Sequence, residues 1–250
     1  MPRYFLEVGY MGTRFSGFQV QDNATTVQGE VEKALATLLR TQVVLTGSSR
    51  TDAGVHAIGN YFHFDVPSAL PDKLPYRLNA ILPADISVTS LRRVHDQAHC
   101  RFDAISRHYR YVVYQRKNPF MNDRGWFLPY PLDADILLEA ADILLQTSDF
   151  TSFAKRNAQV HTHQCTLYES RWYPTPEGWN YEVRGNRFLR GMVRGLVGTM
   201  LQAGRGRIGM SAFKAIIEAK DNTLADFTPP GKGLFLCEVR FPDRYFEQPV

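Results

Sequence analysis

Two hydrophobic periodicities alternate along the first half of the chain, one typical of strands and one typical of helices. A period of two marks the strands, and an apolar stripe of period 3.6 marks the helices. The predicted elements are strand 3–10, helix 26–40, strand 43–49, strand 57–65, helix 72–81 and strand 86–94. The order βαββαβ is the split-βαβ order, in which helices lie on one face of an antiparallel sheet.

The second half of the chain predicts a similar unit with one additional helix. Its elements are strand 106–115, helix 133–146, strand 166–173, strand 179–186, helix 187–203, helix 211–219 and strand 233–241. The segment Thr175-Pro176-Glu177-Gly178 has the composition of a tight turn between two strands. The order is therefore βαββααβ, and the two halves suggest a duplication.

The pattern predicts an α+β protein of two tandem RRM-like (ferredoxin-like) units, residues 1–104 and 105–250. We expect the two antiparallel sheets to join into one extended sheet with the helices on one face. The other face would then form a broad open floor, with the residues at the seam placed to act together. RRM modules present such a sheet to RNA.

The first helix has the clearest signals of any element. Thr25 and Gln28 are spaced as a capping-box pair at its start. Its apolar stripe consists of Val27, Val31, Ala34, Leu35, Leu38 and Leu39.

Composition is that of an ordinary globular protein. The chain has 250 residues, 44% of them hydrophobic, and a net charge of +4 with a pI of about 9.0, a mild bias towards an anionic partner. Cys100, Cys165 and Cys237 lie far apart and are odd in number, so they predict a reducing cytoplasm and no disulfide framework. No apolar run approaches the roughly 18 residues of a membrane span.

Residues 49–57 contain the best candidate for chemistry, the carboxylate of Asp52. On an extended segment Arg50 and Asp52 project from one face, where the cation would keep the acid ionised. An ionised carboxylate can act as a nucleophile or a base. The local sequence alone favours a plainer interpretation, in which Asp52 bonds its own backbone beside Gly54 and Arg50 is a solvated partner.

Residues 50–56, Arg-Thr-Asp-Ala-Gly-Val-His, resemble the signature of the TruA-type tRNA pseudouridine synthases. Other matching segments in the family's order are 10–21, 62–64, 109–111, 149–153, 192–194 and 233–236. The chain departs from the family at Met11, where an Asp is common, and over residues 154–164. The resemblance covers nearly the whole chain.

This resemblance implies an enzyme that isomerises uridine to pseudouridine at positions 38, 39 and/or 40 of the tRNA anticodon stem-loop. It implies Asp52 as the catalytic nucleophile, and it places Arg50, Tyr109, Arg194 and Leu234 in the substrate site. It further implies no cofactor, no metal and a cytoplasmic homodimer in which one tRNA spans both subunits. The sequence leaves open whether Asp52 attacks the sugar C1′, adds to the base or removes a sugar proton.

Two of the implied site residues also have plain structural interpretations. Tyr109 alternates with Tyr111 in a predicted strand, and strand aromatics are usually packed. Its functional role would be to stack on a flipped uracil. Arg187, Arg190 and Arg194 fall on one stripe of the predicted helix, a pattern usual for a solvated face. Beside the stripe, Gly191, Gly195 and Gly198 predict close approach by another helix or by the RNA backbone.

Two other function classes compete with the isomerase. His161, His163 and Cys165 alternate and could mimic the metal site of a hydrolase, but no second ligand pair accompanies them. A noncatalytic pair of RRM-like RNA-binding modules is the stronger alternative, although the strands lack an RNP1-like segment. The effect of losing Asp52 distinguishes these two classes, because a binding module would tolerate the loss and an isomerase would not.

Overall fold

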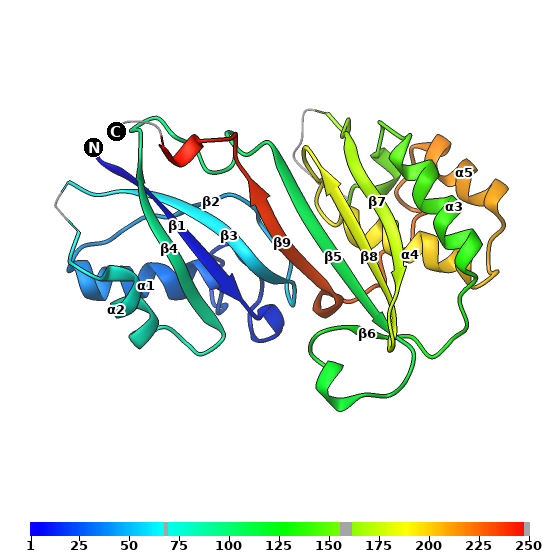
Figure 1. The fold of residues 1–250 in the computed structure, drawn as a ribbon, viewed down its shortest axis with the longest axis horizontal. Helices are drawn as coiled ribbons and strands as arrows, with labels where there is room; N and C mark the ends of the chain where they lie inside the picture. Colours follow the sequence, from blue (N-terminus) through cyan, green and yellow to red (C-terminus); the bar gives the residue numbers. More distant parts are fainter. Residues whose placement is uncertain (68–69, 156–161, 248–250) are drawn as a thin grey trace. The chain divides into compact units, whose positions relative to one another are not determined.

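The computed structural model describes residues 1–67, 70–155 and 162–247, which divide into two compact units. Unit 1 combines Met1–Ile105 with Leu236–Val250, and unit 2 is Ser106–Phe235 (Figure 1). Over these described ranges, no helix is long and apolar enough to cross a membrane.

Unit 1 has the predicted element order. Its elements are β1 (Arg3–Tyr10), α1 (Val27–Leu39), β2 (Thr46–Gly47), β3 (His56–Asp65), α2 (Leu74–Ile81) and β4 (Ile86–Val94). Strand β1 lies between β4 and β3, β2 pairs with the far side of β3, and each of these pairings is antiparallel. The βαββαβ order of the first half is therefore confirmed.

Strand β2 is much shorter than the predicted strand 43–49. The backbone of Leu45 bonds to side chains of α1 instead of to a neighbouring strand. Its N–H donates to Glu32 at 2.9 Å, and its carbonyl accepts from the amide of Gln28 at 2.9 Å. The pairing with β3 then begins at Thr46 and Gly47, and the N–H of Ser48 donates to the carbonyl of Tyr61 at 2.7 Å. Side chains of α1 thus satisfy backbone groups that the hydrophobic pattern assigned to a sheet.

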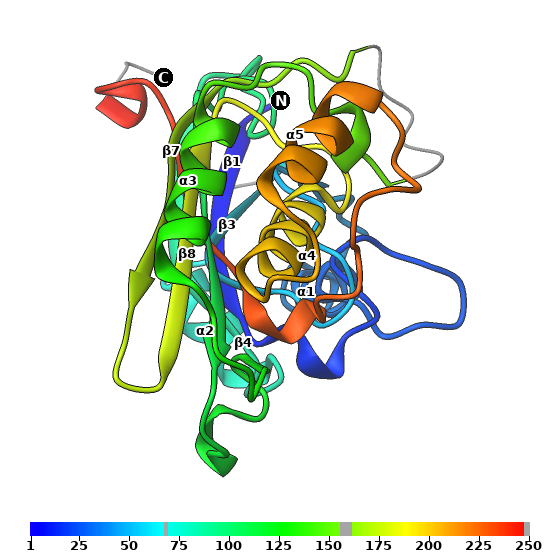
Figure 2. The same ribbon diagram turned by 90° about the vertical axis from the view of Figure 1, so that its right-hand side faces the viewer.

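An aromatic cluster from the C-terminal residues covers one side of the unit 1 sheet. The ring centroid of Phe5 on β1 lies 5.5 Å from that of Phe241 and 5.9 Å from that of Tyr245. Tyr61 on β3 meets Phe241 edge-on at 5.2 Å. In Figure 2 the turn at Tyr245–Glu247 and helix α1 lie on opposite sides of β1 and β3. The predicted open floor is therefore closed over this part of the sheet.

This cluster also explains why the predicted second range, 105–250, differs from unit 2. The last strand, β9 (Leu234–Arg240), begins in unit 2, but its residues from Leu236 onwards belong to unit 1, where they lie next to β3. Phe241 and Tyr245 then pack on β1. Hydrophobic periodicity identifies a strand but not the sheet that receives it.

Unit 2 has a second antiparallel arrangement of three long strands. Its elements are β5 (Ser106–Tyr114), β6 (Trp126–Phe127), α3 (Ala134–Leu145), β7 (Leu167–Pro174), β8 (Gly178–Gly185), α4 (Met192–Gly204) and α5 (Met210–Ala219). Strand β8 lies between β5 and β7, as β3 lies between β1 and β2 in unit 1. The turn at residues 175–178 is confirmed by reciprocal backbone hydrogen bonds between Thr175 and Gly178. The two-residue strand β6 pairs with β5 in parallel and was not predicted.

Side chains on one face of this sheet form the core of unit 2. Tyr111, Tyr181 and Trp172 stand opposite one another on β5, β8 and β7, and each is at most 1% exposed. The indole N–H of Trp172 donates to Met200 of α4, and the hydroxyl of Ser170 donates to the carbonyl of Ala141 in α3. Figure 2 shows α4 and α5 on the same side of β7 and β8. This face of the sheet is therefore covered by helices.

Two predicted helix starts shift in the structure. Helix α1 is capped by Thr26, whose hydroxyl accepts from the N–H of Gly29, and not by a box of Thr25 with Gln28. Helix α4 begins at Met192 and not near residue 187, because its N-cap Gly191 has a φ of +72°. Arg187 and Arg190 therefore precede the helix, and the predicted arginine stripe does not form.

Replacing Thr26 by Ala should destabilise the protein by about 1 kcal/mol, since it removes the N-cap of α1. Thr25→Ala is the matched control, because Thr25 is exposed and caps nothing. Urea denaturation of both variants provides the measurement. Equal losses in the two variants would show that Thr26 is not the cap.

His63 should make unit 1 less stable in mild acid. The ring is 7% exposed, and burial, assisted by the charge of Arg3, lowers its pKa to about 4. The unfolded chain takes up a proton near pH 6.5, whereas the native state does not until about pH 4. Stability should therefore fall by up to about 3 kcal/mol as pH drops through that window.

The measurement is the unfolding free energy of the protein from urea denaturation between pH 4 and 7. The variant His63→Gln lacks the titrating group, so its stability should vary less with pH over this range. Parallel pH profiles for the two proteins would contradict the assignment.

Candidate functional site

Asp52 lies on the loop that joins β2 to β3 in unit 1. Within this loop Thr51 and Val55 are buried, Arg50 is exposed and Asp52 is half-buried. The N–H of Val55 donates to the carbonyl of Asp52 at 3.2 Å, which closes a turn. Gly54 has a φ of +78°, a conformation that favours glycine. The predicted carboxylate is thus presented by a tight turn next to buried backbone.

A second loop, residues 11–18, packs directly on the Asp52 turn. A Cβ on Gly12 would lie 1.9 Å from the carbonyl oxygen of Val55, so only glycine fits there. The N–H of Gly12 donates to Nδ1 of buried His56 at 3.0 Å, which leaves the proton of the neutral ring on Nε2. On the other side of the turn, the N–H of Phe18 donates to the carbonyl of Thr51 at 3.1 Å. The two loops therefore form one backbone-to-backbone contact around Asp52.

A buried hydrogen-bond network fixes the chain just before Asp52. The hydroxyls of Tyr10 and Thr51 are 2.8 Å apart, and the amide of Asn60 donates to the Tyr10 hydroxyl at 3.2 Å. The same amide donates to the carbonyl of Ser49 at 2.9 Å. Because buried polar groups are costly to leave unpaired, this network defines one position for residues 49–51.

The sequence reasoning missed His56, Asn60 and Tyr10 as supports of the turn. A signal existed for Asn60, a polar residue that alternates with Phe62 and Phe64 in the predicted strand 57–65. Inward-facing polar residues in a strand need hydrogen-bond partners. Their partners were not predictable, because they come from β1 and from the 11–18 loop.

In unit 2, Tyr109 lies on the helix-covered face of β5. It alternates with Tyr111, which is fully buried, and its ring meets Phe188 edge-on at 5.0 Å. Its ring therefore lies on the face opposite to the predicted open floor, and its role in the substrate site stays a prediction. The alternation of Tyr109 with Tyr111 along the strand correctly predicted the face on which Tyr109 lies.

Arg194 extends from the first turn of α4 and is held by backbone carbonyls. Its Nε donates to the carbonyl of Pro229 at 2.7 Å and its Nη2 to that of Phe227 at 3.2 Å. Leu234, 7% exposed, begins β9 four residues after Pro230, whose carbonyl accepts from the Tyr111 hydroxyl at 2.9 Å. Arg194 and Tyr111 thus both bind backbone carbonyls of the short segment 227–230, which precedes Leu234.

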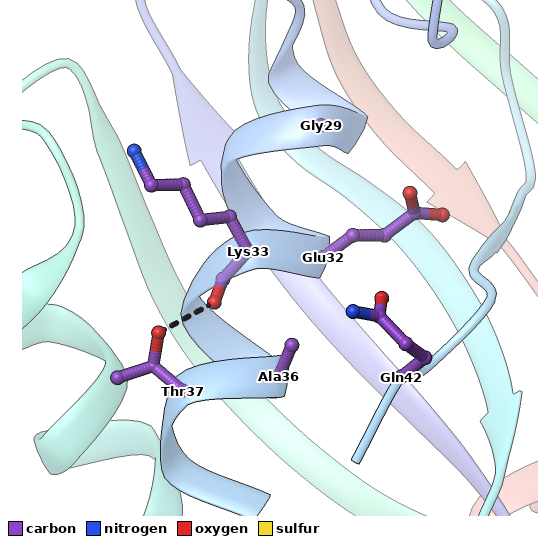
Figure 3. A pocket seen from close by; sticks show the side chains of 6 residues that line it. All are labelled: Gly29, Glu32, Lys33, Ala36, Thr37 and Gln42. Atoms are coloured by element: carbon purple, nitrogen blue, oxygen red, sulfur yellow. Dashed lines mark hydrogen bonds between the residues drawn. The ribbon is translucent and has the colours of Figure 1, made fainter. Parts of the chain in front are cut away.

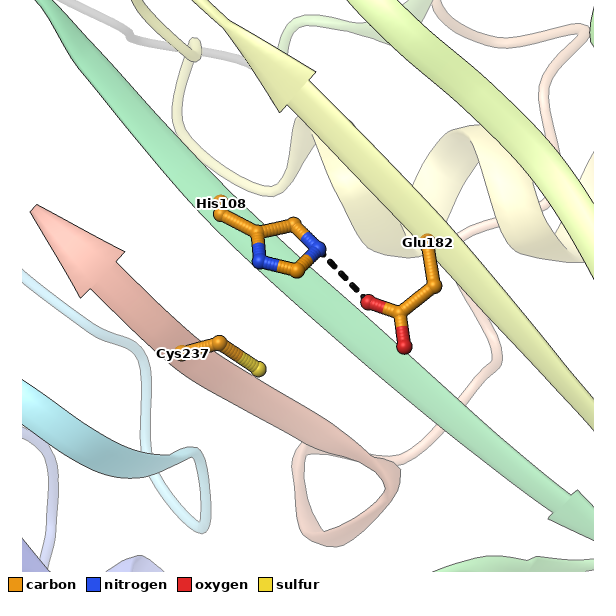
Figure 4. Close-up of side chains that lie close together, drawn as sticks. All are labelled: His108, Glu182 and Cys237. Carbon is orange, nitrogen blue, oxygen red and sulfur yellow. Dashed lines mark ion pairs between the residues drawn. The ribbon is translucent and has the colours of Figure 1, made fainter.

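The opposite face of β5 and β8 carries an ion cluster that the sequence did not suggest. Nε2 of His108 lies 2.6 Å from a carboxylate oxygen of Glu182, as Figure 4 shows, and Arg110 binds the other oxygen. Burial raises the pKa of Glu182, but the bonds from His108 and Arg110 outweigh it and leave that pKa below its usual value. Register places Arg110 opposite Glu182 and His108 on the diagonal, opposite Arg184, which no local pattern reveals.

The chemistry of the alternating His161, His163 and Cys165 does not favour a metal site. His161 lies outside the described residues. Cys165 is 2% exposed, and burial raises the pKa of its thiol to about 11, whereas metals bind the thiolate. This weakens the hydrolase interpretation on chemical grounds.

A surface groove of about 510 Å³ lies along α1, apart from the Asp52 turn. Figure 3 shows its lining, which consists of Gly29, Glu32, Lys33, Ala36, Thr37 and Gln42. Glu32 is occupied with the N–H of Leu45, as described above. None of the predicted site residues lines this groove.

Removing the glycine at position 12 should disturb the Asp52 turn. Gly12→Ala places a methyl group against the Val55 carbonyl, and we expect a loss of about 3 kcal/mol or more in unfolding free energy. Gly209→Ala is the matched control, because a Cβ there meets nothing within 4 Å. Chemical denaturation measures both, and equal midpoints would refute the close contact.

Comparison with known proteins identifies the family. A family model described as "tRNA pseudouridine synthase" matches residues 8–103 and 140–242. A tRNA pseudouridine synthase A from Parabacteroides distasonis is 44% identical over 248 residues, which cover 98% of each chain. The enzyme of that name from Bacillus subtilis is 41% identical over 94% of this chain and 97% of its own. The chain therefore belongs to the tRNA pseudouridine synthase family of isomerases.

Proposed function

We propose that this protein converts uridine to pseudouridine at one or more of positions 38, 39 and 40 of the tRNA anticodon stem-loop, with Asp52 as the catalytic carboxylate. The observation that carries the proposal is the turn that holds Asp52. Its backbone is fixed by Gly12 on one side and by the Tyr10–Thr51–Asn60 network on the other, while the carboxylate remains half-buried. Such preorganisation is what a reacting group requires.

The reaction is an isomerisation, so its atoms balance without an oxidant or a reductant. The bond from uracil N1 to the sugar C1′ breaks, the base turns, and a bond from C5 to C1′ forms. C5 then loses its proton and N1 gains one. An ionised carboxylate can serve by attacking C1′, by adding to the base or by removing a sugar proton.

The other site residues have geometries that suit distinct roles. Arg50 is exposed beside the turn, as a phosphate contact requires. Tyr109 offers a ring that is half-buried against Phe188, which suits stacking on a flipped uracil. The guanidinium of Arg194 is held in one orientation by two backbone carbonyls. The buried side chain of Leu234 provides apolar surface.

We also infer that the two units are RRM-like modules whose sheets join, and that the protein is a cytoplasmic homodimer that binds one tRNA across both subunits. The division of β9 between the two units supports the joining of the sheets. The three cysteines are free thiols, which agrees with a reducing compartment. Sedimentation of the protein with and without tRNA tests the stoichiometry.

Asp52→Asn should abolish pseudouridine formation while leaving tRNA binding nearly unchanged. The amide cannot act as a nucleophile or base, so we expect a loss on the order of 10⁴-fold or more in rate. Pseudouridine mapping on unmodified tRNA, alongside a binding assay, measures both properties. Asp142→Asn, a change at an exposed position of α3, is the control.

Modification by the wild type alone, at positions 38–40, is the expected result. Modification that persists in Asp52→Asn would remove this residue from catalysis. Binding by both proteins with modification by neither would instead support a noncatalytic RNA-binding protein.

A further inference from the structure

We propose that residues 226–230, the 226–230 segment, position the guanidinium of Arg194 for catalysis, and that Thr199 is the positioning residue that anchors this segment. The inference rests on the proposed function, since it assigns Arg194 to the reacting site. It concerns unit 2 alone, where every contact involved is made.

The 226–230 segment holds Arg194 through its backbone. The carbonyls of Pro229 and Phe227 accept from Nε and Nη2, at 2.7 and 3.2 Å. A guanidinium is planar, so two bonds on different nitrogens fix both its position and the orientation of its plane. The positions of these two carbonyls therefore constrain the orientation of Arg194.

The segment reaches Arg194 only because α4 carries glycines on that side. A Cβ on Gly198 would lie 2.1 Å from the carbonyl oxygen of Asp226, and one on Gly195 would lie 2.8 Å from the ring of Phe227. The predicted close approach to these glycines is thus made by the 226–230 segment, and not by a helix. Glycines cost helix stability, and here the cost has a structural reason.

Thr199 anchors the start of the segment from within the helix. Thr199 is 1% exposed, and its hydroxyl donates to the carbonyl of Gly195 at 2.8 Å and accepts from the N–H of Asp226 at 3.0 Å. The carboxylate of Asp226 accepts from Gln202 of α4 and, at 2.8 Å, from the N–H of Thr228. The far end is held by the hydroxyl of Tyr111, which donates to Pro230.

These contacts make a chain of support from the helix to the guanidinium. Without the Thr199 hydroxyl, the N–H of Asp226 loses its partner and the start of the segment can move. The carbonyls of Phe227 and Pro229, one and three residues later, then move as well, and Arg194 moves with them. Because small displacements of a positioned group are costly in catalysis, turnover should fall more than binding.

The test compares Thr199→Val, which keeps the shape and removes the hydroxyl, with Thr199→Ser, which restores it. Ser170→Ala is the matched control, because it removes another buried hydroxyl of unit 2, bound to Ala141 and Tyr181. Single-turnover pseudouridine formation at saturating tRNA, tRNA Kd and urea stability are measured for each. Gln202→Leu, which removes a bond to Asp226 from the helix surface, is the second variant if Thr199→Val does not fold.

We expect Thr199→Val to lower the single-turnover rate about 10- to 100-fold with Kd within about twofold of wild type. Thr199→Ser should recover most of the rate, and Ser170→Ala should retain it despite a comparable loss of stability. Gln202→Leu should also lower the single-turnover rate, as Thr199→Val does. Equal rates in Thr199→Val and Ser170→Ala would overturn the inference.

Arg194→Ala separates the inference from the proposal on which it rests. If this variant loses activity while Thr199→Val keeps it, the positioning role fails and the catalytic assignment of Arg194 stands. If Arg194→Ala is as active as the wild type, the role of Arg194 fails and the inference falls with it. A wild-type protein that binds tRNA but makes no pseudouridine would contradict the proposed function itself.

Discussion

The structure of the candidate site depends on one steric constraint, the contact of Gly12 with the carbonyl of Val55. It lets the 11–18 loop lie against the Asp52 turn without an intervening side chain. The hydrogen bond from Gly12 to His56 and that from Phe18 to Thr51 both require this proximity. A carboxylate on a surface turn would normally sample many positions, whereas this one is carried by backbone that is bonded on both sides.

Unit 2 applies the same principle to a cation. Gly195 and Gly198 of α4 have no side chains, so the 226–230 segment can approach the helix closely. The carbonyls of that segment then orient Arg194. In both units, glycine therefore does not mark flexibility. It marks a place where two stretches of backbone touch, so that a functional group is positioned by main chain instead of by other long side chains.

The sequence predicted the long elements well and the sites of contact between them poorly. Strong periodicity was sufficient for β1, α1, β3, β4 and the β7–β8 hairpin, since each has a clear buried face. It failed for β2, whose backbone bonds to side chains of α1, and for the start of α4, which Gly191 delays. Asp52 was singled out from residues 49–57 and from the family resemblance, but the residues that support its turn, Asn60 and Tyr10, act through partners distant in the chain.

The aromatic cover of the unit 1 sheet has a consequence for how the protein is made. Phe241 and Tyr245 pack on Phe5 and Tyr61, yet all of unit 2 is synthesised between these two sets of residues. The ribosome therefore synthesises the second unit before the first can cover this side of its sheet. Until then the rings of Phe5 and Tyr61 lack their C-terminal cover, and apolar surface exposed during synthesis is prone to association.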